Sequence, residues 1–138
     1  MRDLRGSESL RPAARLRLWL RIVRWYLVVR VRTGREPLPK LAARISDAGP
    51  PRSERIPPRQ LAWAVDRTLR IGRLRPRCIF NALVLYRLLH EQGDAAELVI
   101  GLPKHATDKS AHAWVEIDGI DIGPPPGQNG HEPMARFA

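Results

Sequence analysis

The sequence predicts a single α+β domain in which helices come first and a small antiparallel sheet follows. Apolar residues repeat with a helical period as far as about residue 92 and then change to the runs typical of strands, and Asp118-Gly119 marks a tight hairpin turn. A chain of 138 residues, 43% of them hydrophobic, can bury one core. We therefore expect one domain over 1–138, made of a helical N-terminal extension over 1–57 and a core over 58–138.

The first expected helix begins at Pro12 and ends before Gly34. Its apolar residues recur every three or four positions and form one stripe: Leu16, Trp19, Leu20, Val23 and Leu27. Arg17, Arg21 and Arg24 fall on another face. This pattern predicts a helix that packs its stripe on the core and keeps a solvated basic side, and a peripheral membrane anchor is the alternative.

Two further helices are expected after a proline-rich connection over 47–58. The first runs from about Pro58 to Arg70, and its inward residues are Leu61, Ala62, Val65 and Leu69. The second runs from about Cys78 to Gln92 and carries two neighbouring apolar stripes, so most of its circumference should be buried. Strands are expected over 97–102, 111–117 and 120–122.

The charge and hydropathy patterns argue against several classes of protein. The net charge is +10, but aromatic residues make up only 6% of the chain and offer no stacking array, so we expect no nucleic-acid partner. No stretch of about 18 uncharged apolar residues occurs, so we expect no membrane span. The first residues lack the pattern of a secretory signal, and we expect a cytoplasmic protein.

Cys78 is the only cysteine, so it can neither form an internal disulfide nor help to build a four-thiolate zinc site. We expect no metal and no cofactor. Because Cys78 opens a helix, unpaired N–H groups and the helix dipole should favour its thiolate and could bind an oxyanion, and Arg75 and Arg77 add positive charge. These features predict a nucleophile. A buried structural thiol is the alternative, because Cys78 also lies on an apolar stripe.

Of the four histidines, only His112 falls in an expected strand, where alternation puts it on one face with Trp114 and Glu116. A strand is a rigid mount for a base that must be aimed at a thiol. A hydrogen-bonded core imidazole is the alternative. The other histidines end a helix, lie in a polar loop, or lie in the Gly-rich tail: His90, His105 and His131.

Three segments together carry a family resemblance: Arg77-Cys78-Ile79-Phe80-Asn81-Ala82-Leu83, Ala96-Glu97-Leu98-Val99-Ile100-Gly101, and His112-Ala113-Trp114-Val115-Glu116. Over roughly residues 60–138 the chain resembles the transglutaminase-like superfamily, and more closely the leader peptidases of lasso peptide biosynthesis. The resemblance implies a transglutaminase-like or papain-like fold and a cysteine protease that uses a Cys, His, Asp set, in which Cys78 is the nucleophile and His112 the base. Such enzymes remove the leader from a ribosomally made precursor peptide, after which a partner cyclase closes an isopeptide ring.

The resemblance also implies a separate leader-recognition protein, because the N-terminal part of this chain is an arginine-rich helix without the strands that a recognition domain needs. The face that carries Arg17, Arg21 and Arg24 is a candidate docking surface for that protein.

The third catalytic residue matches the family less well. The acid expected about a dozen residues beyond the histidine falls at Pro124, and the nearest carboxylates are Asp118, which the turn explains, and Asp121. With that turn, Asp121 pairs with Glu116 on the His112 face, about 13 Å along the strand from His112. Either the turn differs, or a bulge or bend brings Asp121 closer, or Asn129 or a backbone carbonyl orients the imidazole. We take Asp121 as the third residue.

Two other functions fit the same residues. An acyltransferase would use the same Cys78 and His112 and admit an amine in place of water. A basic adaptor that binds an acidic peptide or nucleic acid would leave Cys78 inert in the core.

Overall fold

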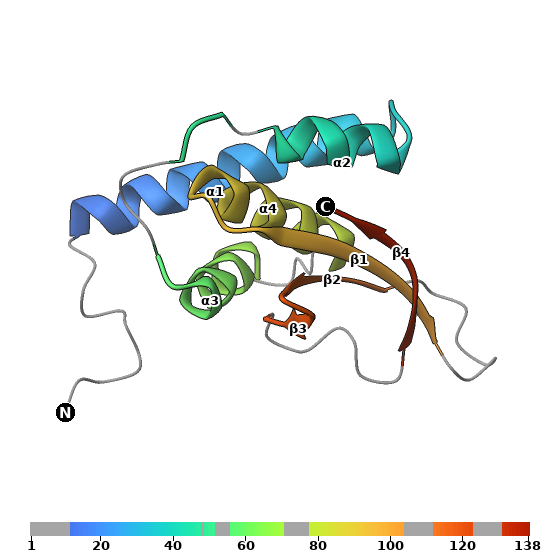
Figure 1. The fold of residues 1–138 in the computed structure, drawn as a ribbon. Helices are drawn as coiled ribbons and strands as arrows, with labels where there is room; N and C mark the ends of the chain where they lie inside the picture. Colours follow the sequence, from blue (N-terminus) through green and yellow to red (C-terminus); the bar gives the residue numbers. More distant parts are fainter. Residues whose placement is uncertain (1–11, 48, 52–55, 71–77, 104–111, 123–130) are drawn as a thin grey trace.

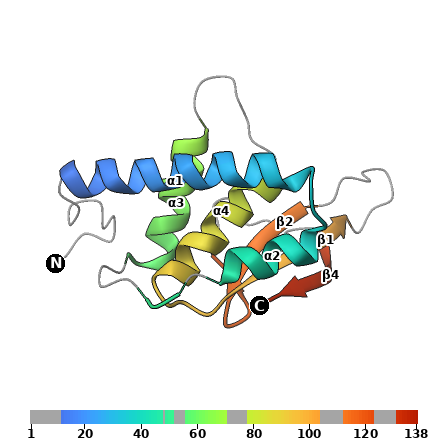
Figure 2. The same ribbon diagram turned by 90° about the horizontal axis from the view of Figure 1, so that it is seen from above.

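The computed structural model describes residues 12–47, 49–51, 56–70, 78–103, 112–122 and 131–138. These residues form four helices followed by a four-stranded antiparallel sheet, which confirms the α+β prediction (Figures 1 and 2). The helices are α1 (Pro12–Thr33), α2 (Leu38–Ser46), α3 (Pro58–Leu69) and α4 (Cys78–Glu91). The strands are β1 (Ala96–Pro103), β2 (His112–Ile117), β3 (Ile120–Asp121) and β4 (His131–Phe137), in the sheet order β3-β2-β1-β4.

Helix α4 is the centre of the fold. It contacts α1, α2 and α3 as well as β1 and β2, so it lies between the helical layer and the sheet (Figure 1). Its buried side chains surround the helix axis, as the two predicted stripes require: Ala82, Leu83, Val84, Leu85, Tyr86, Leu88 and Leu89. Burial of α4 on both sides fixes the position of the helix relative to the sheet.

Helix α1 has the predicted bounds but presents the opposite face to the core. The residues of α1 that are buried are Leu18, Ile22 and Val29. Most of the predicted inward stripe instead faces solvent: Leu16, Trp19, Leu20 and Leu27 are exposed, and Val23 is half-buried. The prediction of the buried face was wrong because α1 is apolar on two opposite faces, and periodicity alone does not distinguish them.

Helix α2 was not predicted, whereas α3 was. Pro37 and Pro39 are typical of a chain segment that ends a helix, yet Pro37 is the N-cap of α2 and Pro39 stands in its first turn, where a missing N–H costs nothing. In α3 the four residues predicted to face inward are all buried: Leu61, Ala62, Val65 and Leu69. The described residues of the connection before Pro58 contain no helix or strand, as expected.

The sheet contains the predicted hairpin and one unpredicted strand. Asp118 and Gly119 have φ values of 53° and 77°, which confirms the tight turn between β2 and β3. Strand β4 was missed because Pro133 and the preceding glycines are typical of a loop. The structure accommodates Pro133 at the edge of the sheet, beside a register shift between Ile100 and Gly101.

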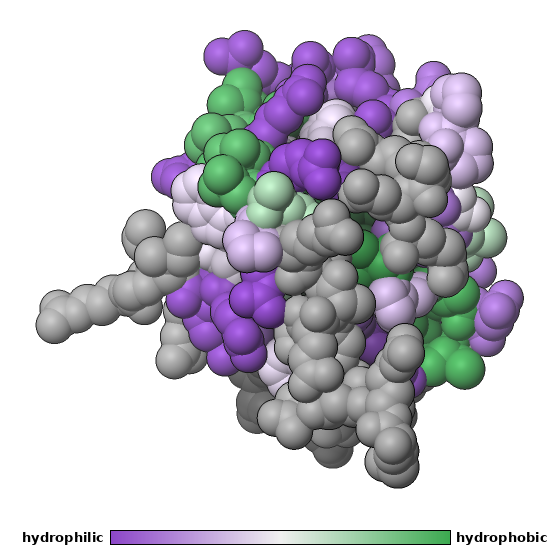
Figure 3. Space-filling view, turned by 90° about the vertical axis from the view of Figure 1, so that its left-hand side faces the viewer, coloured by the Kyte–Doolittle hydropathy of each residue, from purple (hydrophilic) through white to green (hydrophobic). Residues whose placement is uncertain are grey.

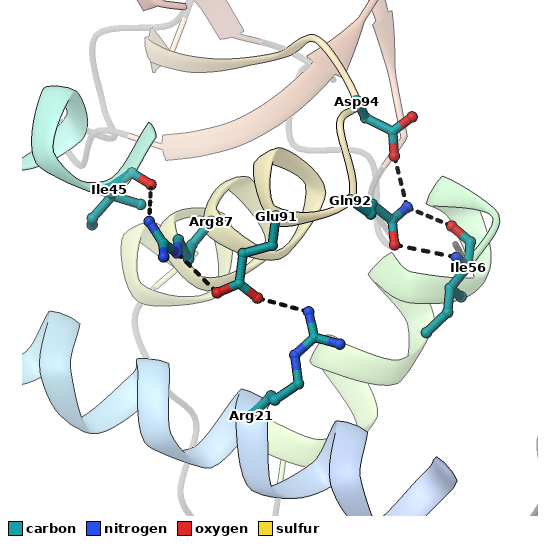
Figure 4. A network of polar contacts seen from close by, with 7 residues as sticks. All are labelled: Arg21, Ile45, Ile56, Arg87, Glu91, Gln92 and Asp94. Carbon is teal, nitrogen blue, oxygen red and sulfur yellow. Dashed lines mark hydrogen bonds and ion pairs between the residues drawn. The ribbon is translucent and has the colours of Figure 1, made fainter. Parts of the chain in front are cut away.

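The helical layer is joined by an ion-pair network at the end of α4 (Figure 4). Glu91 accepts hydrogen bonds from Arg21 of α1 at 2.7 Å and from Arg87 at 3.1 Å. Arg87 also donates to the carbonyl oxygens of Ile45 and Asp47 and lies over the ring of Trp25. Arg21 was predicted to lie on a solvated face, but this network turns it toward Glu91.

Among the described residues, none of the helices combines the length and the apolar character needed to cross a lipid bilayer. The same residues hold no group of three or more His, Cys, Asp or Glu side chains placed to bind a metal ion.

Candidate active site

Cys78 is the first residue of α4. The N–H groups of a helix's first turn have no partner within the helix, and they bear the positive end of the dipole. The first turn of α4 contains no acidic side chain that would cancel this field. Arg75 and Arg77, which were expected to add positive charge, lie outside the described residues. The local backbone at Cys78 is therefore one that can stabilise a thiolate or an oxyanion.

Chain direction brings the start of α4 and the start of β2 to the same end of the domain (Figure 1). Helix α4 and strand β1 are consecutive and run in opposite directions, and β2 runs antiparallel to β1 with Gly101 paired to His112. From Cys78 to Glu91 the helix rises about 20 Å, and from Ala96 to Gly101 the strand rises about 17 Å. Because the two lengths nearly match, the backbones of Cys78 and His112 lie near the same end.

The face of β2 that carries Trp114 and Glu116 holds a buried carboxylate that sequence reasoning missed. Glu116 is 1% exposed, accepts a hydrogen bond from Nε1 of Trp114 at 2.7 Å and another from Arg136 of β4 at 2.7 Å. The first contact confirms that Trp114 and Glu116 share a face, as strand alternation predicted. The bond to Glu116 and its charge raise the pKa of the Arg136 guanidinium above its ordinary value.

This carboxylate ties β2 to β4 across β1, with Arg136 also 3.8 Å from Glu97. Ala113 and Val115, on the other face of β2, belong to the core beneath α4. Strand β2, which begins at His112, is therefore held on both faces, and a candidate base at its first residue has a rigid mount. A Glu two residues after a Trp in a strand was the available signal, but its arginine partner lies in the unpredicted β4.

Asp121 lies toward the other end of β2. The register pairs Glu116 with Asp121 and Ile117 with Ile120, without a bulge between β2 and β3. Asp121 is therefore four residues, or about 13 Å, along the strand from the register position of His112. That register is the one predicted from the Asp118-Gly119 turn, and it does not by itself bring Asp121 to His112. Pro124 and Asn129 lie outside the described residues.

A second histidine lies in the sheet. The prediction that only His112 falls in a strand was wrong, because His131 is the first residue of β4 and pairs with Pro103. Gly101 pairs with both His112 and Pro133, so β2 and β4 begin at the same end of the sheet on opposite sides of β1. Two strand spacings, about 10 Å, separate them. His105 lies outside the described residues.

Asn81 is a further polar residue in the first turn of α4, three positions after Cys78. Its Oδ1 atom is shielded from solvent, and among the described residues it has no hydrogen-bond partner. A buried acceptor without a donor is unusual. Because Asn81 lies one turn from Cys78, it is a candidate acceptor for an N–H group of a bound peptide.

The chain matches the transglutaminase-like superfamily over residues 13–136. No match to the chain was found among the curated proteins or among the solved structures. Members of this superfamily include cysteine proteases and acyltransferases and are usually cysteine-dependent enzymes. The matched range begins in α1, well before the segments that carry the resemblance in the sequence, and extends through α4 and β2 into β4. The chain therefore belongs to the transglutaminase-like superfamily.

Proposed function

We propose that this protein is a cytoplasmic cysteine peptidase that removes the leader from a ribosomally made precursor peptide during lasso peptide biosynthesis. The observation that carries the proposal is the common placement of Cys78, at the start of α4, and His112, at the start of β2, in a chain of the transglutaminase-like superfamily. The sequence around both residues resembles the leader peptidases, and the superfamily supports cysteine-dependent acyl chemistry.

In the proposed reaction, the Cys78 thiolate attacks the carbonyl carbon that joins leader to core peptide. Backbone N–H groups at the start of α4 stabilise the oxyanion. His112, as the imidazolium, gives a proton to the departing amine, which leaves a thioester between the leader and Cys78 and frees the core peptide's N-terminus. His112 then takes a proton from water as that water attacks the thioester, and collapse of the intermediate releases the leader as a carboxylic acid that ionises in solvent. The Cys78 thiolate and the His112 imidazolium are thereby restored.

We propose that a separate leader-binding protein presents the precursor, and that the lasso cyclase receives the new N-terminus. The chain alone should cleave a precursor slowly, because a short site near Cys78 holds it weakly. Presentation by a bound partner raises the substrate's effective concentration to about the millimolar range for a short flexible link, without a new contact at the site. The measurement is the cleavage rate of purified precursor with and without the leader-binding protein, read by mass.

A high rate from the chain alone that does not rise on addition of the partner would mean that leader recognition resides in this chain. A companion assay tests the alternative of a non-enzymatic adaptor. An activated Cys78 should react with a thiol alkylator at pH values well below the ordinary thiol pKa of about 8.5. Reaction only after unfolding would identify Cys78 as a structural thiol.

We propose Asp121 as the residue that orients His112, and substitution tests that role. His112→Ala should reduce kcat/KM by at least about a thousandfold, because the base is lost, whereas Asp121→Asn should reduce it by about tenfold to a hundredfold. His131→Ala is the matched control, since His131 also begins a strand at this end of the sheet. Unchanged kinetics in Asp121→Asn would remove it from the site, and Asn129→Ala then tests the other candidate.

A further inference from the structure

Helix α1 exposes a continuous apolar stripe on the side away from the core. We call it the outer stripe. Its residues and their exposed fractions are Leu16 at 58%, Trp19 at 43%, Leu20 at 52%, Leu27 at 54% and Val31 at 55%. Leu18, Ile22 and Val29 fill the opposite, buried face of the same helix. From Leu16 to Val31 the stripe is about 22 Å long.

The internal packing of the domain does not account for the outer stripe. Single exposed apolar residues are ordinary, but a contiguous row at helical spacing marks a surface that contacts something else. Figure 2 shows α2, α4 and the sheet all on one side of α1, while α3 crosses it. Viewed from the end where α1 begins, the surface has hydrophobic patches directly beside strongly hydrophilic ones (Figure 3).

The charges on α1 itself are of one sign. Helix α1 contains six arginines and no Asp or Glu. Arg21 turns inward to Glu91, and the other five are exposed: Arg15, Arg17, Arg24, Arg30 and Arg32. The neighbouring helices add exposed cationic side chains, Lys40 and Arg44 on α2 and Arg59 and Arg67 on α3. They outnumber the acids on this side, where Glu36 pairs with Arg32 and Arg44 and Asp66 pairs with Arg70. Helix α3 also exposes Trp63.

The acidic residues of the described strands and of the hairpin turn lie on the other layer of the molecule: Glu97, Glu116, Asp118 and Asp121 among those with described side chains. The helical side thus combines an apolar stripe, arginines on both of its flanks and a tryptophan at its margin. This is the residue arrangement of helices that lie in the plane of an anionic membrane surface, with apolar side chains in the headgroup boundary and arginines at the phosphates.

We propose that α1 binds an anionic lipid bilayer through the outer stripe, lying parallel to the membrane plane. A second copy of the chain is a poor occupant, because pairing two α1 helices would bring ten exposed arginines together without an acid on either helix. The basic field extends over α1, α2 and α3, which suits an extended anionic surface. This binding does not depend on the peptidase proposal, since no residue of the outer stripe has a part in the proposed catalysis.

The test is co-sedimentation of the full chain with vesicles of phosphatidylcholine containing phosphatidylglycerol, compared with phosphatidylcholine alone. We expect binding to the anionic vesicles only, and weakening as salt increases. Leu20→Gln/Leu27→Gln should weaken the partition coefficient about a hundredfold, and Arg24→Gln/Arg30→Gln about twentyfold. Met134→Gln is the control, because Met134 is 64% exposed but lies on β4, and it should bind as the parent does.

Three results would overturn the assignment. The first is no binding to anionic vesicles by a chain whose thermal unfolding is cooperative. The second is equal binding by the Leu20→Gln/Leu27→Gln variant, with an unfolding midpoint equal to the parent's. The third is that this variant keeps vesicle binding but loses acceleration by the leader-binding protein, or loses self-association, because the outer stripe would then be a protein interface.

Discussion

Replacing Cys78 by alanine is expected to abolish precursor cleavage while the domain remains folded. A nucleophile has no substitute, because neither the alanine methyl group nor the backbone N–H groups at the start of α4 can form the thioester. Removing one sulfur atom costs no more than about 1 to 2 kcal/mol of unfolding free energy, even in a packed core. The measurement is single-turnover cleavage by mass, alongside a urea unfolding curve.

Cys78→Ser is the matched control for this prediction, since it keeps the size of the side chain and a weak nucleophile. It should retain at most a trace of activity. Undiminished cleavage by either variant would end the cysteine-peptidase account, and cleavage lost together with the unfolding transition would mean that the substitution reports on folding.

Glu91→Ala is expected to cause the largest loss of stability among the polar substitutions. Glu91 has 9% of its side chain exposed and joins Arg21 of α1 to Arg87 of α4. Its removal leaves two partly buried guanidinium groups without their counter-ion, which costs about 3 kcal/mol. Urea unfolding at neutral pH measures this loss. Asp66→Ala is the control: its partner Arg70 is 57% exposed, so that pair should be worth less than about 1 kcal/mol.

The stability that Glu91 contributes should decrease as the pH falls. Burial alone would raise the pKa of Glu91, but the hydrogen bonds and charges of Arg21 and Arg87 outweigh burial and lower it. The pKa of Glu91 in the folded state lies below its value in the unfolded state. At pH values between these two pKa values the unfolded chain binds more protons, so stability rises with pH in that range. The difference between parent and Glu91→Gln should be constant above about pH 6 and shrink as pH falls below about 4.5. A difference that grows toward acid pH would contradict this sign.

The helices and strands could be predicted where the local sequence patterns agreed. Which face of α1 is buried could not be predicted. Helix α3 and its four buried residues follow from one apolar stripe, and Asp118-Gly119 fixes the β2–β3 register. In α1, two apolar faces compete, and only tertiary contacts such as the Arg21 to Glu91 pair decide between them. Strand β4 could not be predicted from an alternating apolar pattern, because its Pro133 is tolerated in a sheet only at the edge.

The candidate site was predictable in part. Cys78 and His112 are marked by their own segments, and the matched lengths of α4 and β1 bring their backbones to one end of the domain. The cluster around Glu116 could not be predicted, since its partner Arg136 is twenty residues away in the sequence. Arg136 lies on β4, and no local sequence pattern predicts that β4 pairs with β1. The register position of Asp121 could be predicted from the turn alone. Because that register does not bring Asp121 to His112, its role in catalysis stays a prediction.

The most direct test of the central claim is to follow precursor cleavage in water enriched in the heavy isotope of oxygen. The chain is incubated with its precursor and the leader-binding protein, and both fragments are weighed. A cysteine peptidase predicts a core peptide with an unlabelled free N-terminus and a leader whose new C-terminal carboxylate carries one heavy oxygen, with neither product formed by Cys78→Ala. A leader that instead carries an amide to an added amine would indicate an acyltransferase, and an intact precursor in the presence of the leader-binding protein would contradict the peptidase account.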